Sequence, residues 1–254
     1  WLRRVTQRRP LVLGAAAVVL LAVVAIVWSM TSRPAVDQRA WVIISDFENN
    51  TQDSVSNRAL DAALFAGLQQ SDYVSVFPRP RIQQALVRMG ITGAEASKGL
   101  DEARAREVAD REGVAAVITG SILAVDSSYT ISLRVIDPRT GEALAADSRR
   151  ADRRADVLAT MDELVRSLRR AIGESSAAIA KNAVPLPRAT TSSLEALRRY
   201  ADGLAAHSAG QVVAAAEMWK QAVALDSTFA LAHAELGYAA YTANNRPVGD
   251  AHFD

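Results

Sequence analysis

The sequence contains no cysteine. Disulfides, thiol catalysis and zinc or iron–sulfur sites built on cysteine are therefore excluded for these residues. Lysine is also rare, because only Lys98, Lys181 and Lys220 are present and arginine carries almost all of the positive charge. The formal net charge is only +1, so the composition gives no reason to expect a nucleic-acid partner.

The motifs of common catalytic sites are missing as well. The chain contains no HExxH, GxSxG, Walker or GxGxxG motif. His207 and His233 fall in predicted helices, His252 lies near the end, and no carboxylates surround them in a metal-binding pattern. We therefore expect no enzyme, and no catalytic, cofactor-binding or metal-binding residue. An enzymatic alternative, in which the α/β segment binds or hydrolyses a small ligand, would need a polar pocket at the strand ends.

A long apolar run is present near the start of the chain. Leu11 to Trp28 reads LVLGAAAVVLLAVVAIVW, which as a helix would be about 27 Å long, close to the thickness of a bilayer core. A secretory signal peptide has a shorter apolar region and a small-residue cleavage site. Since several arginines precede the run, we expect a cytoplasmic basic stub at 1–10, a transmembrane helix at 11–30 in a bacterial inner membrane, and an extracytoplasmic chain after about residue 31.

After a tether at 31–39, residues 40–181 alternate between strand and helix patterns, which predicts a mixed sheet with flanking helices. The turn sequence DPRTG predicts that the last three strands form an antiparallel meander, whereas the first two are separated by a helix and can run parallel. The expected strands are 41–47, 73–77, 115–123, 129–137 and 142–148. The expected helices are 54–70, one that ends at Gly90, 100–112 with Gly113 as its cap, and a closing helix at about 154–180.

Two charged stretches have both a structural and a functional interpretation. Asp46 and Glu48 follow the first strand, where ligands gather in α/β folds. A catalytic carboxylate pair needs a partner with a displaced pKa, and the sequence nominates none, so we expect loop acids that end the strand and cap the next helix. The run SRRADRRAD at 148–156 is expected to be a solvated helix start, with contact to anionic lipid or an acidic partner as the alternative.

The end of the chain changes to a helical pattern with a repeat. A Pro- and Ser/Thr-rich linker is expected at 182–193, followed at 194–254 by the start of an all-α solenoid. Two glycines lie 34 residues apart, which is the tetratricopeptide period. More repeats are expected to follow Asp254, because such repeats are stable only in stacks. The residues at the repeat-signature positions are Gly203, Ala215, Trp219, Ala222, Leu236 and Gly237.

Several weak motifs in order carry a family resemblance over roughly residues 40–181. They are WVIISDFEN, YVSVFPRPRIQQAL, GVAAVITGSI and ISLRVIDPRTGE. With the repeats behind them, they resemble the TolB amino-terminal-like α/β domain of bacterial single-pass membrane proteins that carry tetratricopeptide repeats. The resemblance implies a membrane-anchored serine/threonine kinase before Trp1, which this chain does not contain.

The functional expectation follows from this resemblance. The chain is interpreted as the extracytoplasmic sensory and protein-interaction portion of a membrane signalling protein, which binds a protein or peptide in the repeat groove. The alternative is an envelope-assembly or scaffold protein whose repeats gather partners without any effector domain. The residues before Trp1 would distinguish the two, and the sequence does not predict the oligomeric state.

Overall fold

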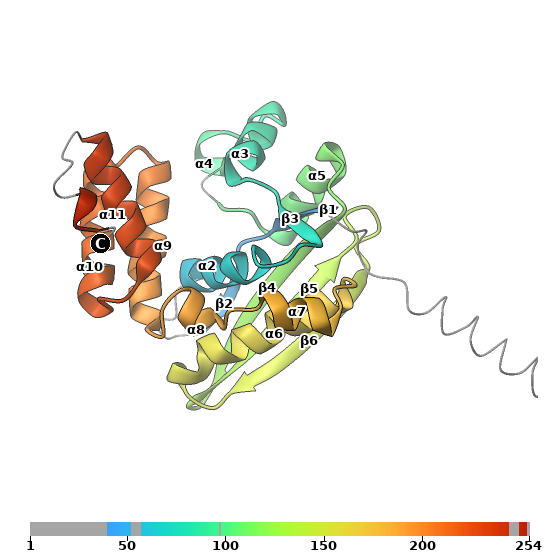
Figure 1. Ribbon diagram of the computed structural model, residues 1–254. Coiled ribbons are helices and arrows are strands. Elements are labelled where there is room, and N and C mark those ends of the chain that lie inside the picture. The colour runs from blue at the N-terminus through green and yellow to red at the C-terminus, as the bar shows by residue number, and fades with distance from the viewer. Residues whose placement is uncertain (1–39, 52–56, 97, 244–248, 253–254) are drawn as a thin grey trace, which may run out of the picture. The chain divides into compact units, whose positions relative to one another are not determined.

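The computed structural model describes residues 40–51, 57–96, 98–243 and 249–252 (Figure 1). The predicted stub, transmembrane helix and tether, 1–39, lie outside the described residues. The described residues belong to one compact unit.

The described chain contains a mixed sheet, as the sequence predicts, and this sheet has six strands where the sequence predicts five (Figure 1). The strand order is β3-β1-β4-β5-β6, and the short β2 also pairs with β4. The strand β1 runs parallel to both β3 and β4, whereas β4, β5 and β6 form the expected antiparallel meander. The strands are β1 (Ala40–Ile44), β2 (Glu48–Asn50), β3 (Val74–Val76), β4 (Ala116–Val125), β5 (Ser128–Ile136) and β6 (Ala143–Ala151).

Helices cover both faces of the parallel part of the sheet. Val42 and Ile44 of β1 belong to the core beneath α2 and α6, whereas Ile43 belongs to a second core with α3 and α5. A strand buried on both faces has to be apolar throughout, which explains the unbroken VII run. These helices are α2 (Asn57–Leu68), α3 (Arg79–Arg88), α5 (Glu102–Glu112) and α6 (Val157–Ala171), with the short α4 (Gly93–Ala96) between α3 and α5.

The single closing helix expected at 154–180 is divided in the structure. A short 3-10 turn (Arg154–Asp156) precedes α6, and a second helix, α7 (Ser176–Asn182), follows it. Gly173 breaks the helix with a φ of 103°, a conformation that residues other than glycine rarely adopt. Because Ala143–Ala151 forms β6, the basic run at 148–156 begins as the end of a strand and not as a helix.

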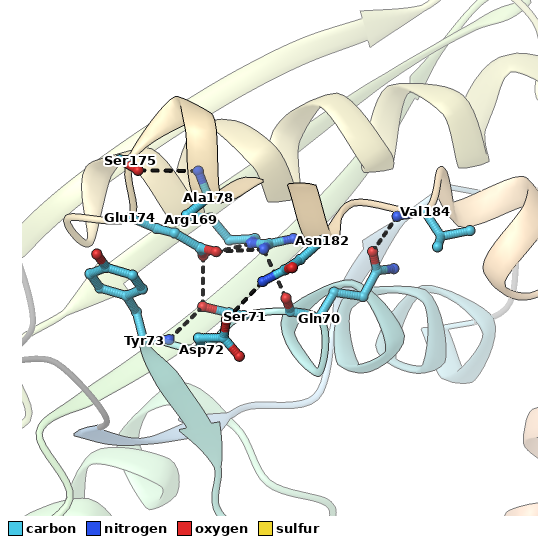
Figure 2. Close-up of polar contacts among 10 residues, drawn as sticks. All are labelled: Gln70, Ser71, Asp72, Tyr73, Arg169, Glu174, Ser175, Ala178, Asn182 and Val184. Carbon is cyan, nitrogen blue, oxygen red and sulfur yellow. Dashed lines mark hydrogen bonds and ion pairs between the residues drawn. The ribbon is translucent and has the colours of Figure 1, made fainter. Parts of the chain in front are cut away.

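The break between α6 and α7 is held by a buried ion pair (Figure 2). The Arg169 guanidinium donates to both carboxylate oxygens of Glu174, at 2.8 and 2.6 Å, and to the carbonyl of Gln70 at 2.9 Å. The Ser71 hydroxyl donates to the same carboxylate at 2.7 Å. The two charged side chains are only 2% and 0% exposed. The group therefore ties the α2–β3 loop to the end of α6.

The helical part of the chain packs against the α/β part within the same unit. After the short α8 (Leu186–Ala189) come α9 (Leu194–Ser208), α10 (Val212–Leu225) and α11 (Ala230–Thr242), drawn in orange to red in Figure 1. Each of these three helices packs on the next, and α9 packs on α2. These contacts show a helical segment, while its assignment to tetratricopeptide repeats and the predicted domain boundaries stay predictions.

Candidate functional site

The first candidate site, the end of β1, is occupied by the protein's own contacts. Asp46 accepts a hydrogen bond from the Leu100 backbone N–H at 2.6 Å and pairs with Arg79 at 2.9 Å. Its own backbone N–H donates to the Leu100 carbonyl at 2.8 Å. Glu48 is exposed at the start of β2. Asp46 therefore fastens the loop before α5 to the sheet, in place of the helix cap that the sequence predicts.

A larger candidate site lies between α2 and α9. We call it the α2–α9 cleft, a hollow of about 630 Å³ lined by α2, α9 and α11 together with Asp46 and Arg79. Its lining is mostly apolar and includes Phe65, which is 41% exposed, and Leu231, which is 36% exposed. A concave, mostly apolar space of this size with a few polar groups is typical of binding sites in proteins.

The charged side chains of the cleft fall into two groups. The two arginines already have partners, because Arg58 pairs with Asp202 at 2.8 Å and Arg79 pairs with Asp46. Asp61 and Glu235 also line the cleft, and no lysine or arginine nitrogen among the described residues lies within 4.0 Å of either carboxylate. The cleft therefore holds two acidic side chains without an ion-pair partner among the described residues.

Burial dominates the titration of the cleft carboxylates. Burial and the nearby Asp46 raise the pKa of Asp61 to about 7, against the opposing effects of Arg79, Arg58 and the Phe47 N–H. That N–H donates to the Asp61 carboxylate at 3.1 Å. Burial also raises the pKa of Glu235, although His207 opposes the shift. Raised pKa values in a cleft are a recognised property of functional sites.

The raised pKa of Asp61 predicts a pH-dependent stability. Below pH 3.8, the ordinary pKa, Asp61 is protonated in both the folded and the unfolded state. Its titration therefore does not change the free energy of unfolding there. As the pH rises towards about 7, the unfolded state ionises first, so this group lowers the stability of the folded state. The loss is about 2–4 kcal/mol above pH 7. Asp61→Asn keeps the acceptor oxygen and removes the titration, so it should stabilise the protein by this amount at pH 8 and not at pH 4.

Urea unfolding of both proteins across this pH range is the measurement. Asp152→Asn, at an 83% exposed carboxylate, is the matched control and should show no such trend. A difference between Asp61→Asn and the parent that stays constant from pH 4 to pH 8 contradicts the prediction.

The sequence does not reveal this site directly, because its walls come from segments far apart in the chain. Asp61 and Glu235 are separated by the whole of β3 to α10. One local signal was available: Asp61 is an acid directly beside Leu60, in a helix whose neighbouring residues are almost all apolar. An acidic residue among apolar neighbours indicates either that the position is exposed to solvent or that the charge has a functional role.

The repeat-signature residues take packing positions in the helical segment. Trp219 is 1% exposed, and its indole N–H donates to the Tyr200 carbonyl at 3.2 Å. A Cβ atom on Gly203 would lie 2.4 Å from the indole nitrogen, so this close approach requires glycine. The other four signature residues are buried: Ala215, Ala222, Leu236 and Gly237.

The histidines contact one another or aromatic rings. The His207 ring lies 5.7 Å from that of Trp219, and the Nδ1 atoms of His233 and His252 are 3.1 Å apart. Among the residues that the structure describes, no group of three or more His, Asp or Glu side chains is arranged to hold a metal ion.

One face of the β4–β5–β6 meander forms a second exposed surface. Ile122 and Ile131 point into the core under α6, so the alternate residues point to the opposite side. There Leu123 is 47% and Val125 is 52% exposed. The strand register aligns the remaining members in rows across the three strands. We call this surface the open sheet face: Leu123, Val125, Thr130, Ser132, Ser148 and Arg150.

Comparison with known protein families identifies the α/β part. Residues 19–149 match the family described as peptidoglycan-synthase activator LpoB, which is just over half of the chain. The chain belongs to the LpoB family. In the described structure, the matched range runs from β1 into β6, whereas α6 to α11 follow it. No curated protein sequence matches the chain significantly.

Solved structures with similar folds include the LpoB C-terminal domain from Escherichia coli, with 16% identity and a TM-score of 0.42 over 50% of this chain and 93% of that one. Lipoprotein GNA1162 from Neisseria meningitidis has 19% identity and a TM-score of 0.35 over 44% and 79%. TolB from Acinetobacter baumannii has 14% identity and a TM-score of 0.33 over 55% and 28%. Similarities this weak support no inference about this chain.

Membership of the LpoB family corrects the interpretation of the chain as a kinase-coupled receptor. The assignment to TolB-like, repeat-bearing proteins behind a serine/threonine kinase is wrong, because the family match is to a peptidoglycan-synthase activator. The signal-transduction function is wrong for the same reason. The order of strands and helices indicates a fold, and proteins with the same fold can have unrelated functions. The order of the motifs therefore led to the wrong function.

The predicted location is corrected by the same finding. An inner-membrane receptor with its main part facing outward does not agree with the LpoB family. Within the described ranges, no helix is long and apolar enough to cross a membrane. The predicted span at 11–30 itself lies outside these ranges. The envelope-assembly alternative agrees better with the LpoB family.

Proposed function

We propose that this chain acts in bacterial envelope assembly by binding a peptidoglycan synthase and regulating its activity, without catalysing a reaction itself. The observation that carries the proposal is the LpoB family match, since that family is described as an activator of this enzyme. An activator works through a protein partner, so the proposal assigns this chain a regulatory role.

The open sheet face is the proposed contact surface for the synthase. Both residues of the exposed pair Leu123 and Val125 lie inside the matched range 19–149, as does most of the meander. An exposed apolar pair with a polar rim and an arginine has the layout of a protein interface. Ser132 and Ser148 hydrogen bond to each other at 2.9 Å, which leaves a surface of short side chains that a partner can approach closely.

Leu123→Asp tests both parts of the proposal. The purified chain is expected to bind a peptidoglycan synthase of its source bacterium and to raise its rate of glycan polymerisation. The substitution places a carboxylate at the centre of the contact and should weaken binding about tenfold or more. Surface plasmon resonance and a glycan-polymerisation assay measure the two effects.

Val213→Asp is the matched control, because Val213 is 86% exposed on α10 and lies outside the matched range. It should bind the synthase like the parent. If no synthase of the source bacterium binds the chain, the proposed function is wrong. If Leu123→Asp binds as tightly as Val213→Asp, the function stands and the contact surface is wrong.

A further inference from the structure

The α2–α9 cleft is not accounted for by membership of the LpoB family. Its α2 wall lies within the matched range 19–149, but α9 and α11 come from the part of the chain that follows it. The cleft therefore exists only because this chain places additional helices beside the α/β core. The helices that form the cleft are also different elements from the strands that form the open sheet face.

The dimensions of the cleft favour an elongated occupant. Its lining extends along α2 from Arg58 to Gln69, the residue after the helix, and along α9 from Leu197 to Ser208. Eleven helical residues span about 16 Å, which is the length of roughly five residues of extended peptide. The apolar side chains along both helices would receive the apolar side chains of such a segment.

The charged side chains of the cleft favour an occupant that carries a positive group. Both arginines of the lining are engaged by Asp46 and Asp202, whereas Asp61 and Glu235 have no cation within ion-pair distance among the described residues. Half-buried carboxylates of this kind are stabilised most strongly in their ionised form by a cation that enters with a ligand and displaces water. At pH 8, where Asp61 is ionised, the carboxylates of the cleft would instead repel an anionic segment.

We propose that the α2–α9 cleft binds an extended peptide segment that carries a basic side chain. Apolar residues of the segment pack on Phe65 and Leu231, and its ammonium or guanidinium group pairs with Asp61 or Glu235. Burial and the nearby Asp46 raise the pKa of Asp61, and a cation that enters the cleft with the segment would oppose this shift. This interaction is additional to synthase binding through the open sheet face.

Three acetylated and amidated pentapeptides test the proposal: Leu-Lys-Leu-Lys-Leu, Leu-Glu-Leu-Glu-Leu and Leu-Gln-Leu-Gln-Leu. Each is titrated into the ¹⁵N-labelled chain at pH 8, and amide shifts are followed by NMR. The lysine peptide is expected to cause saturable shifts in α2, α9 and α11, and to bind about tenfold more tightly than the glutamine peptide. The glutamate peptide should bind most weakly.

Variants separate the charge contribution from the packing contribution. Asp61→Asn combined with Glu235→Gln keeps the size of both side chains and should remove the preference for lysine over glutamine. Asp152→Asn, an exposed carboxylate elsewhere, should leave the preference unchanged. Ala205→Trp places a large side chain in the lining and should weaken all three peptides.

The proposal is overturned if no peptide causes saturable shifts at millimolar concentration, if the glutamate peptide binds as well as the lysine peptide, or if the shifts map outside the cleft. These outcomes are independent of the synthase assay. A chain that binds the synthase and no peptide contradicts only the cleft proposal, and the reverse result contradicts only the proposed function.

Discussion

Replacing Arg169 by methionine is expected to lower the free energy of unfolding by about 3–5 kcal/mol. The substitution leaves the Glu174 carboxylate, which is 0% exposed, without its charged partner in the interior. It also removes the hydrogen bond from the guanidinium to the Gln70 carbonyl (Figure 2). The loop after α2 and the break between α6 and α7 then lose the group that joins them.

The double variant Arg169→Met with Glu174→Leu distinguishes a lost ion pair from lost packing. Removing both charges avoids the isolated buried carboxylate, so much of the lost stability should return. Arg170→Met is the matched control, since Arg170 is the exposed neighbour, and it should change stability by less than about 1 kcal/mol. Urea unfolding of the parent and of the three variants is the measurement. A single variant that unfolds like the parent contradicts the assigned role of the pair.

Acid should affect the parent more than the single variant. Burial by itself would raise the pKa of Glu174, but hydrogen bonds from Arg169 and Ser71 lower it below its ordinary value of 4.5. A depressed folded-state pKa contributes stability above pH 4.5, and this contribution is lost as the pH falls through the folded-state value. The difference in stability between the parent and Arg169→Met should therefore shrink below pH 4.5.

Replacing Trp219 by alanine is expected to cost about 3–5 kcal/mol as well. The indole fills the space between α9 and α10 and rests against the backbone of Gly203, and its loss leaves a large cavity. The hydrogen bond to the Tyr200 carbonyl is lost at the same time. Because α9 forms one wall of the α2–α9 cleft, the variant should also lose peptide binding.

Hydrogen exchange locates the effect of Trp219→Ala. Amides of α9 to α11 should exchange faster, whereas those of β4 and β5 should keep most of their protection. Lys220→Ala, at the exposed neighbouring position, is the control and should change neither exchange nor unfolding. If Trp219→Ala exchanges like the control, Trp219 does not hold the helices together.

The sequence by itself determined the features that depend on near neighbours in the chain. The apolar run of β1 predicts a buried strand, the DPRTG turn predicts the β5–β6 connection, and Gly113 ends α5 with a φ of 67°. The spacing of Leu60, Leu64 and Leu68 correctly predicts the buried face of α2. Each of these follows from backbone geometry or from periodicity within a few residues.

Only the tertiary structure decided the features that depend on distant segments. It assigns Asp46 to a loop contact with Leu100, brings Arg169 to the Gln70 carbonyl, and places Asp61 and Glu235 in the lining of one cleft. The physical reason is that the pKa and the partners of a side chain depend on burial and on charges from other elements, which local sequence patterns do not encode. The sequence pattern did not identify the binding partner for a similar reason. The pattern of strands and helices specifies the core, whereas the residues on the surface are free to differ.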